Sequence, residues 1–205
     1  MRLIGDKLYS VRGGRTLFAD LSFAVARGEA LVVTGPNGSG KTSLLRTIAG
    51  LLPPAEGHIR LEGGATDQLM REQCHYIGHL NALKAALTVG ENAGFWACFL
   101  GGGANRVERA LDTLGLAALR DIPAGYLSAG QQRRLGLARL LVAERPVWLL
   151  DEPTTSLDGA GQDALIRAVN AHLAGGGMAV AATHAPLAFV NARALALGGA
   201  AVAAA

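Results

Sequence analysis

The chain has 205 residues, of which 50% are hydrophobic and 17% are charged. This composition excludes a disordered chain and suits one folded domain. The formal net charge is +3 and the lysines and arginines form no long basic run, so we expect no nucleic acid as a partner. No apolar stretch reaches the roughly 18 residues of a membrane-spanning helix, and the first residues lack the pattern of a signal peptide. We therefore expect a protein that stays in the cytoplasm.

The first part of the chain predicts antiparallel strands. Residues 3–26 suggest two strands around a turn at Gly13-Gly14, which is a hairpin pattern. Residues 58–62 and 74–78 have the composition of short strands. Both could join the same antiparallel sheet.

A second set of strands is more apolar and alternates with helices. Residues 30–34, 147–150 and 178–183 are apolar runs, as expected of parallel strands that are covered on both faces. Residues 42–49 and 160–173 have helical spacing. This alternation predicts an α/β core whose ligands bind at the carboxyl ends of the strands.

Two further segments complete the predicted elements. Residues 88–140 are expected to be mostly helical, with loops at 101–103 and 123–128. Gly198-Gly199 stands between two short apolar runs, which predicts a hairpin at the end of the chain.

A glycine-rich motif follows the strand at residues 30–34 and precedes a helix. It matches the pattern GxxxxGK(S/T), in which backbone N–H groups and the positive end of the helix bind phosphate. The lysine can reach the β- and γ-phosphates, and the hydroxyl can ligate Mg²⁺. The candidate ATP-binding residues are Gly35, Pro36, Asn37, Gly38, Ser39, Gly40, Lys41 and Thr42.

Two acids end the apolar strand at residues 147–150. Asp151 is expected to lie beside the Mg²⁺ and to bind it through water, and Thr42 is the direct ligand. Glu152 stands where it could polarise a water molecule aimed at the γ-phosphate. Two acids after a strand are a weak signal alone, but the phosphate-binding motif makes the pair a strong one.

A third motif decides the family. Ser128, Gly130 and Gln131 open an arginine-rich helix, where a hydroxyl and backbone donors form a second anion site. With the two motifs above, this segment resembles the signature of ATP-binding cassette (ABC) proteins, with Ala129 in place of the commoner glycine. The resemblance covers the whole chain. It also makes Asp158 a D-loop residue and His184 the histidine that contacts the γ-phosphate.

The resemblance implies a fold and a mechanism. The expected fold is an α/β P-loop NTPase core with an antiparallel β subdomain and a helical subdomain at about residues 84–140, all within a single ABC ATP-binding domain of residues 1–205. The cofactor would be Mg-ATP. Two such chains, copies or paralogues, would enclose two ATP molecules, with Ser128 and Gly130 acting on the partner's nucleotide. The helical subdomain would pass the motion to membrane-spanning subunits.

Two positions depart from the family pattern. A glutamine usually contacts Mg²⁺ and water after the first lobe boundary, but Leu80 stands there. His79 or a backbone carbonyl would then substitute, and Leu80 would face either the γ-phosphate or the lobe boundary. The residue that stacks on adenine is expected to be Arg12, since a guanidinium can stack on a purine, with Tyr9 as the alternative.

Smaller details resemble the haem-exporter ATPases of cytochrome c maturation. The matching segments are residues 12–18, 76–79 and 127–131, together with the compact end of the chain. This branch implies the cytoplasmic face of a bacterial inner membrane. The alternatives are the ATPase of another ABC transporter and a non-transport ABC ATPase, although the chain lacks the insertions typical of the latter.

Haem and membrane partners give two last expectations. The five histidines have no paired ligand spacing and no CxxCH occurs, so we expect no direct haem binding. Phe95, Trp96 and Phe99 share one helical face. They would form either the core of the helical lobe or a contact with a membrane-spanning partner.

Overall fold

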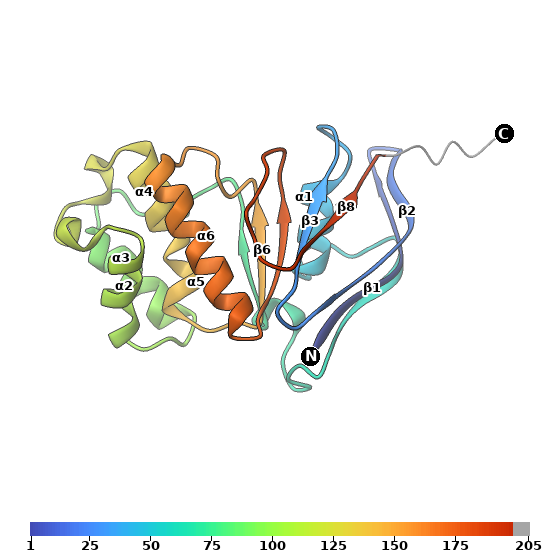
Figure 1. Cartoon of the computed structure of the whole chain (residues 1–205), viewed down its shortest axis with the longest axis horizontal. Helices are drawn as coiled ribbons and strands as arrows, with labels where there is room; N and C mark the ends of the chain where they lie inside the picture. Colours follow the sequence, from blue (N-terminus) through green and yellow to red (C-terminus); the bar gives the residue numbers. More distant parts are fainter. Residues whose placement is uncertain (199–205) are drawn as a thin grey trace.

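The computed structural model describes residues 1–198, and a parallel sheet lies at its centre (Figure 1). The strand order is β5-β6-β7-β3-β8, and every neighbouring pair is parallel. All residues of β6 and β7 are buried, which explains their apolar sequences. The carboxyl ends of the strands meet at one edge. The strands are β3 (Ala30–Thr34), β5 (Cys74–Ile77), β6 (Val147–Asp151), β7 (Met178–Ala182) and β8 (Ala192–Ala196).

A second sheet of three antiparallel strands has the order β2-β1-β4. It is formed by β1 (Arg2–Arg12), β2 (Arg15–Ala26) and β4 (Glu56–Glu62), which confirms the predicted hairpin and the strand at residues 58–62. The prediction that residues 74–78 join this sheet is wrong. Strand β5 pairs with β6 instead, because Cys74, His75 and Ile77 are buried and need cover on both faces.

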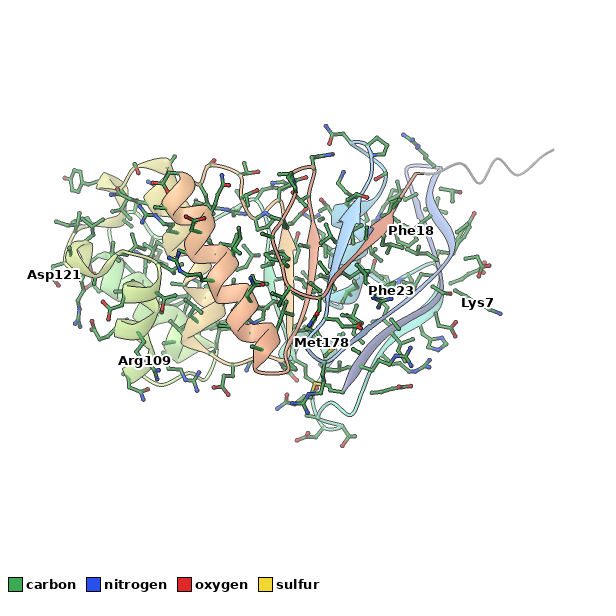
Figure 2. The ribbon with its side chains drawn as sticks, in the orientation of Figure 1. Lys7, Phe18, Phe23, Arg109, Asp121 and Met178 are labelled. Atoms are coloured by element: carbon green, nitrogen blue, oxygen red, sulfur yellow. The ribbon has the colours of Figure 1, made fainter. Side chains whose placement is uncertain are left out.

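Helix α1 (Lys41–Ile48) follows the phosphate-binding motif and packs between the two sheets. Its Leu44, Leu45 and Ile48 are fully buried and contact apolar side chains of both sheets. Phe18 and Phe23 fill the same interface from the antiparallel sheet (Figure 2). This packing fixes the start of α1 at the carboxyl edge of β3.

The other helices gather on the opposite side of the parallel sheet (Figure 1). Helix α6 (Gly159–Ala174) lies nearest to the sheet, and the group of α2 to α5 extends beyond it, as far as Arg109 and Asp121 (Figure 2). This confirms that residues 88–140 are mostly helical. The helices are α2 (Val89–Phe99), α3 (Asn105–Thr113), α4 (Ala129–Leu137) and α5 (Arg139–Val142), with 3-10 turns at Met70–Glu72, Ala117–Leu119 and Ala124–Tyr126.

The last described strand, β8, returns beside β3. The description of the structure ends at Gly198. The rest of the hairpin predicted at Gly198-Gly199 therefore lies outside the described residues. Within residues 1–198, none of the helices combines the length and the apolar character that crossing a membrane requires.

Candidate nucleotide site

The phosphate-binding motif forms a tight loop between β3 and α1. Gly35 has φ 140° and Gly40 has φ 100°, in the region that favours glycine. A Cβ atom on Gly35 would lie 2.3 Å from the carbonyl oxygen of Leu197. Glycine at this position therefore allows β8 to pass directly against the loop.

Lys41 is folded back onto this loop. Its Nζ donates to the carbonyl oxygens of Gly35 at 2.7 Å and Pro36 at 3.1 Å, and the residue is only 8% exposed. Nearby, the buried Oγ of Ser39 has no hydrogen-bond partner among residues 1–198. A buried polar atom without a partner is costly, so the loop is suited to receive an additional polar group such as a phosphate oxygen.

Asp151 lies opposite the loop at the end of β6. It is 1% exposed, and its Oδ1 accepts a hydrogen bond of 3.1 Å from the hydroxyl of Thr42. The other oxygen, Oδ2, accepts from the Tyr76 hydroxyl at 3.3 Å and lies 3.7 Å from His79 Nε2. Burial, with the nearby Asp151 charge, raises the pKa of Tyr76, so the phenol stays a neutral donor.

Sequence reasoning missed Tyr76 as a partner of Asp151. Strand β5 at residues 74–77 lies parallel to β6, so the carboxyl ends of the two strands are neighbours. A correct placement of this strand would have put Tyr76 near Asp151. Placing this segment in the antiparallel sheet hid the relation.

Glu152 and His184 approach each other at the same edge. Glu152 Oε1 lies 3.4 Å from His184 Nε2, and Asn37 Oδ1 lies 2.8 Å from the same nitrogen. Lys41 Nζ is 3.2 Å away, but an ammonium can only donate. Nε2 therefore faces two acceptors, on Asn37 and Glu152, and one donor, Lys41. If Nε2 carries a proton, it can donate to Asn37 and Glu152, and Lys41 then donates to the two backbone carbonyl oxygens instead.

One cavity of about 360 Å³ is lined by Lys41, Asp151 and Glu152, and Arg12 also lines it. Tyr9 lies outside this cavity and along a separate groove, with its hydroxyl 3.2 Å from Thr16 Oγ1. Leu80 is 83% exposed, so of its two alternatives, packing into the lobe boundary is wrong. The lining residues are Arg12, Leu17, Asn37, Gly38, Gly40, Lys41, Thr42, Ser43, His79, Asp151 and Glu152.

The signature residues lie elsewhere. Ser128 caps helix α4: its Oγ accepts from Gln131 N at 3.2 Å, and its own N–H donates to Gln131 Oε1 at 2.8 Å. Asp158 caps α6 by accepting from Gly161 N at 2.9 Å. Ser128, Gly130, Gln131 and Asp158 are absent from the lining of the cavity.

Comparisons with known proteins agree with this geometry. A profile described as ABC transporter matches residues 18–155. The chain belongs to the ABC transporter family. As an ABC ATPase it binds nucleotide, and the cavity beside the phosphate loop is the place its geometry offers for one.

Individual relatives of this ABC protein are similar over nearly their whole length. The chain is 56% identical over 201 residues to the cytochrome c biogenesis ATP-binding export protein CcmA of Nitrobacter winogradskyi, covering 98% of this chain and 100% of the relative. The same-named protein of Bradyrhizobium diazoefficiens is 55% identical, with 97% and 99% covered.

Solved structures support the fold of this ABC protein. A putative ABC transporter ATP-binding protein from Pyrococcus furiosus superposes with a TM-score of 0.83 at 21% identity, covering 96% of this chain and 98% of that one. The expected P-loop NTPase fold with its two additional parts is thereby confirmed.

Proposed function

We propose that the chain hydrolyses Mg-ATP as the ATPase subunit of a membrane export complex that serves cytochrome c biogenesis. The observation that carries the catalytic part is that Lys41, Thr42, Asp151 and Glu152 line one cavity, with His184 in contact with Lys41 and Glu152. The names of the relatives at 55–56% identity carry the biological part.

The donor set fits a magnesium ion. Thr42 supplies a hydroxyl and Asp151 a buried carboxylate 3.1 Å from it, both oxygen ligands of the kind that Mg²⁺ prefers. Among residues 1–198, no group of three or more His, Cys, Asp or Glu side chains forms a metal cluster, so phosphate and water oxygens would complete the coordination. When bound, the ion would offset the negative charge that develops on the phosphates.

Each polar side chain then has a task. Lys41 exchanges its carbonyl partners for β- and γ-phosphate oxygens, where a charge-assisted bond is stronger. Glu152 orients the attacking water molecule as a general base. His184 exchanges its Asn37 partner for a γ-phosphate oxygen, to which Nε2 donates. Arg12, which lines the cavity, stacks on the adenine.

The signature residues are proposed to act on a second subunit, a copy of this chain or a paralogue. Ser128 is exposed at the start of α4, where backbone donors and the helix dipole favour an anion. Since Ser128, Gly130 and Gln131 do not line their own chain's cavity, they are free to meet the partner's ATP. Asp158 lies in the neighbouring segment and would touch the same interface.

A membrane-spanning partner is proposed to dock on α2. Phe95 is 45% exposed and Phe99 is 70% exposed, so the interpretation of these two residues as lobe core is wrong. Their rings stack with centroids 6.0 Å apart, and Trp96 meets both edge-on. Such a patch suits an apolar partner and would hold the chain at the cytoplasmic face of a bacterial inner membrane.

The biological proposal is tested by deleting the gene and staining for haem-linked c-type cytochromes. We expect these to disappear while b-type cytochromes remain, because the complex would supply haem to apocytochrome c without this chain binding haem itself. A Lys41→Ala copy should not restore them, whereas an Arg109→Ala copy, altered at the far end of the helices, should. Normal c-type cytochromes in the deletion strain would favour the alternative, an ABC transporter of another compound.

A further inference from the structure

Arg133 is a buried charge that the proposed catalytic scheme does not use. It is 4% exposed and belongs to helix α4, the helix that begins beside the signature residue Ser128. In the sequence it is one of several arginines in this helix, and nothing in the pattern distinguishes it. In the structure it is the arginine that reaches the carboxyl edge of the parallel sheet.

The two ends of its guanidinium hold different segments. Nη1 donates to the carbonyl oxygen of Gly78 at 2.8 Å and to Asn81 Oδ1 at 3.3 Å. Nη2 donates to the carbonyl oxygens of Glu152 at 3.1 Å and Asp151 at 3.4 Å. Because the guanidinium is planar and rigid, these bonds fix the distance between the loop that carries His79 and the end of β6.

Glu152 needs such support. Its φ is 46°, a left-handed conformation that side chains other than glycine rarely adopt. Its N–H donates to Ala182 O at 2.8 Å, and Arg133 holds its carbonyl group on the other side. Strained backbone of this kind persists only when its surroundings determine it. Relaxation toward negative φ would turn the carboxylate away from His184.

Stability alone does not explain a buried arginine here. Burial lowers the pKa of Arg133, and its Nε has no hydrogen-bond partner in the part of the chain that the structure describes, so the fold bears a cost for this charge. Apolar residues of similar volume often replace buried charges without loss of stability. The feature that can explain this buried arginine is the set of backbone carbonyl oxygens to which it donates.

We propose that Arg133 is a positioning residue that holds Glu152 in its left-handed conformation and joins it to the signature helix. The inference rests on the proposed function, in which Glu152 acts on the chain's own ATP and Ser128 on the partner's. Since Arg133 and Ser128 belong to the same short helix, a displacement of Ser128 reaches Glu152 through one side chain. The closure of one nucleotide site would thus align the base of the other.

The test compares Arg133→Met with Arg134→Met in the full chain. Arg134 is the adjacent residue and donates to Leu114 O at 3.1 Å, away from β6. Its buried Nε, like that of Arg133, meets no partner within the described residues. We expect Arg133→Met to lower kcat roughly 10- to 100-fold, the range for a displaced catalytic group, with little change in the Kd for a fluorescent ATP analogue. Arg134→Met should keep kcat within about 3-fold, because the hydrogen bond of Arg134 goes to Leu114 and not to the backbone of Glu152.

A double-mutant cycle with Glu152→Gln tests whether Arg133 affects kcat through Glu152. If Arg133 acts through Glu152, Arg133→Met should add little to the loss caused by Glu152→Gln, because coupled residues are not additive. Arg133→Lys, which keeps the charge but not the planar fork, should recover part of kcat and serves where the methionine variant does not fold. Melting temperatures of all variants show whether a loss is merely structural.

The outcomes separate this inference from the proposed function. Parent-level hydrolysis by Glu152→Gln would overturn the role of Glu152 and the inference together. A large loss in Glu152→Gln with parent-level kcat in Arg133→Met and Arg133→Lys would overturn the inference alone. Full additivity in the double variant, or equal losses in Arg133→Met and Arg134→Met, would do the same.

Discussion

The nucleotide cavity and the exposed face of α2 both present side chains suited to a binding partner, but they hold these side chains differently. In the cavity, Lys41 and Asp151 are almost fully buried and are fixed by hydrogen bonds to the backbone and to neighbouring side chains. On α2, Phe95 and Phe99 are exposed and touch mainly each other and Trp96.

This difference indicates two ways of preparing for a ligand. Polar groups that must meet a transition state gain from being preorganised, since they then need no rearrangement during the reaction. Aromatic rings that bind an apolar surface need only be exposed, because the burial of their apolar area drives the association. Substitutions at the two regions should therefore affect different measurements.

The largest expected effect is in the cavity. Glu152→Gln should lower ATP turnover by roughly 10²–10⁴-fold, the range for the loss of a general base, while ATP still binds. It should also accumulate an ATP-bound dimer, because closure remains and reopening is lost. Turnover and size-exclusion chromatography with ATP measure both. A variant that hydrolyses ATP at the parent rate would remove Glu152 from the catalytic scheme.

On α2, the effect should appear only with the membrane partner. Replacing Phe95 and Phe99 together by serine should weaken binding to the membrane-spanning subunits by on the order of 10²-fold, since buried aromatic anchors carry most of an interface's energy. Turnover of the isolated chain should stay near the parent value. Val190→Ser, which alters another exposed apolar residue, is the control for co-purification. Equal binding in all three proteins would place the docking surface elsewhere.

The scaffold beneath both regions should respond to acid. Burial lowers the pKa of His75 and of His172 to about 4, so each histidine stays neutral in the folded chain while the unfolded chain takes up protons below about pH 6.5. The free energy of unfolding should therefore fall between about pH 6.5 and pH 4, by up to about 1.4 kcal/mol per pH unit for each histidine.

Urea unfolding at several pH values measures this dependence. A His75→Gln variant should lose about half of the fall, because one of the two buried histidines is removed. A fall that is unchanged in this variant would show that other groups cause it.

The smallest effect is expected at Leu80. The side chain is 83% exposed, so Leu80→Gln should leave the melting temperature within about 1–2 °C, as for most surface changes. If the new amide reaches the cavity beside His79, turnover of the assembled complex should change a few-fold. No change in either measurement would show that this loop does not meet the nucleotide.

Much of the fold follows from local patterns. The phosphate loop requires glycines at particular positions, and this spacing is rare in other structures. The strands that end at Thr34 and Asp151 are apolar because both of their faces are covered. Family resemblance and strand pattern together named several residues that line the cavity, among them Arg12, Lys41 and Asp151, whereas Gly35, Pro36, Ser39 and His184 are absent from its lining.

What remained hidden depends on tertiary contacts. Strand β5 has four residues, too few to reveal whether one face or both are covered, and its misplacement concealed Tyr76. The contacts of Arg133 join residues up to 55 positions apart, and no local pattern encodes them. Helical spacing placed Phe95 and Phe99 on one face, but only the packing of the neighbouring helices decides that this face is exposed.

The close approach of Leu197 to Gly35 has a consequence for biosynthesis. Strand β8 pairs with β3, and Leu197 N donates to Thr34 O at 2.8 Å, so the phosphate loop near the beginning of the chain is braced by one of its last described segments. Before that segment leaves the ribosome, β3 is an unprotected edge strand. We expect a nascent chain released at Asn191 to retain no ATP analogue, and retention by that fragment would refute this. Binding of ATP would then begin only after strand β8 has been synthesised and has paired with β3.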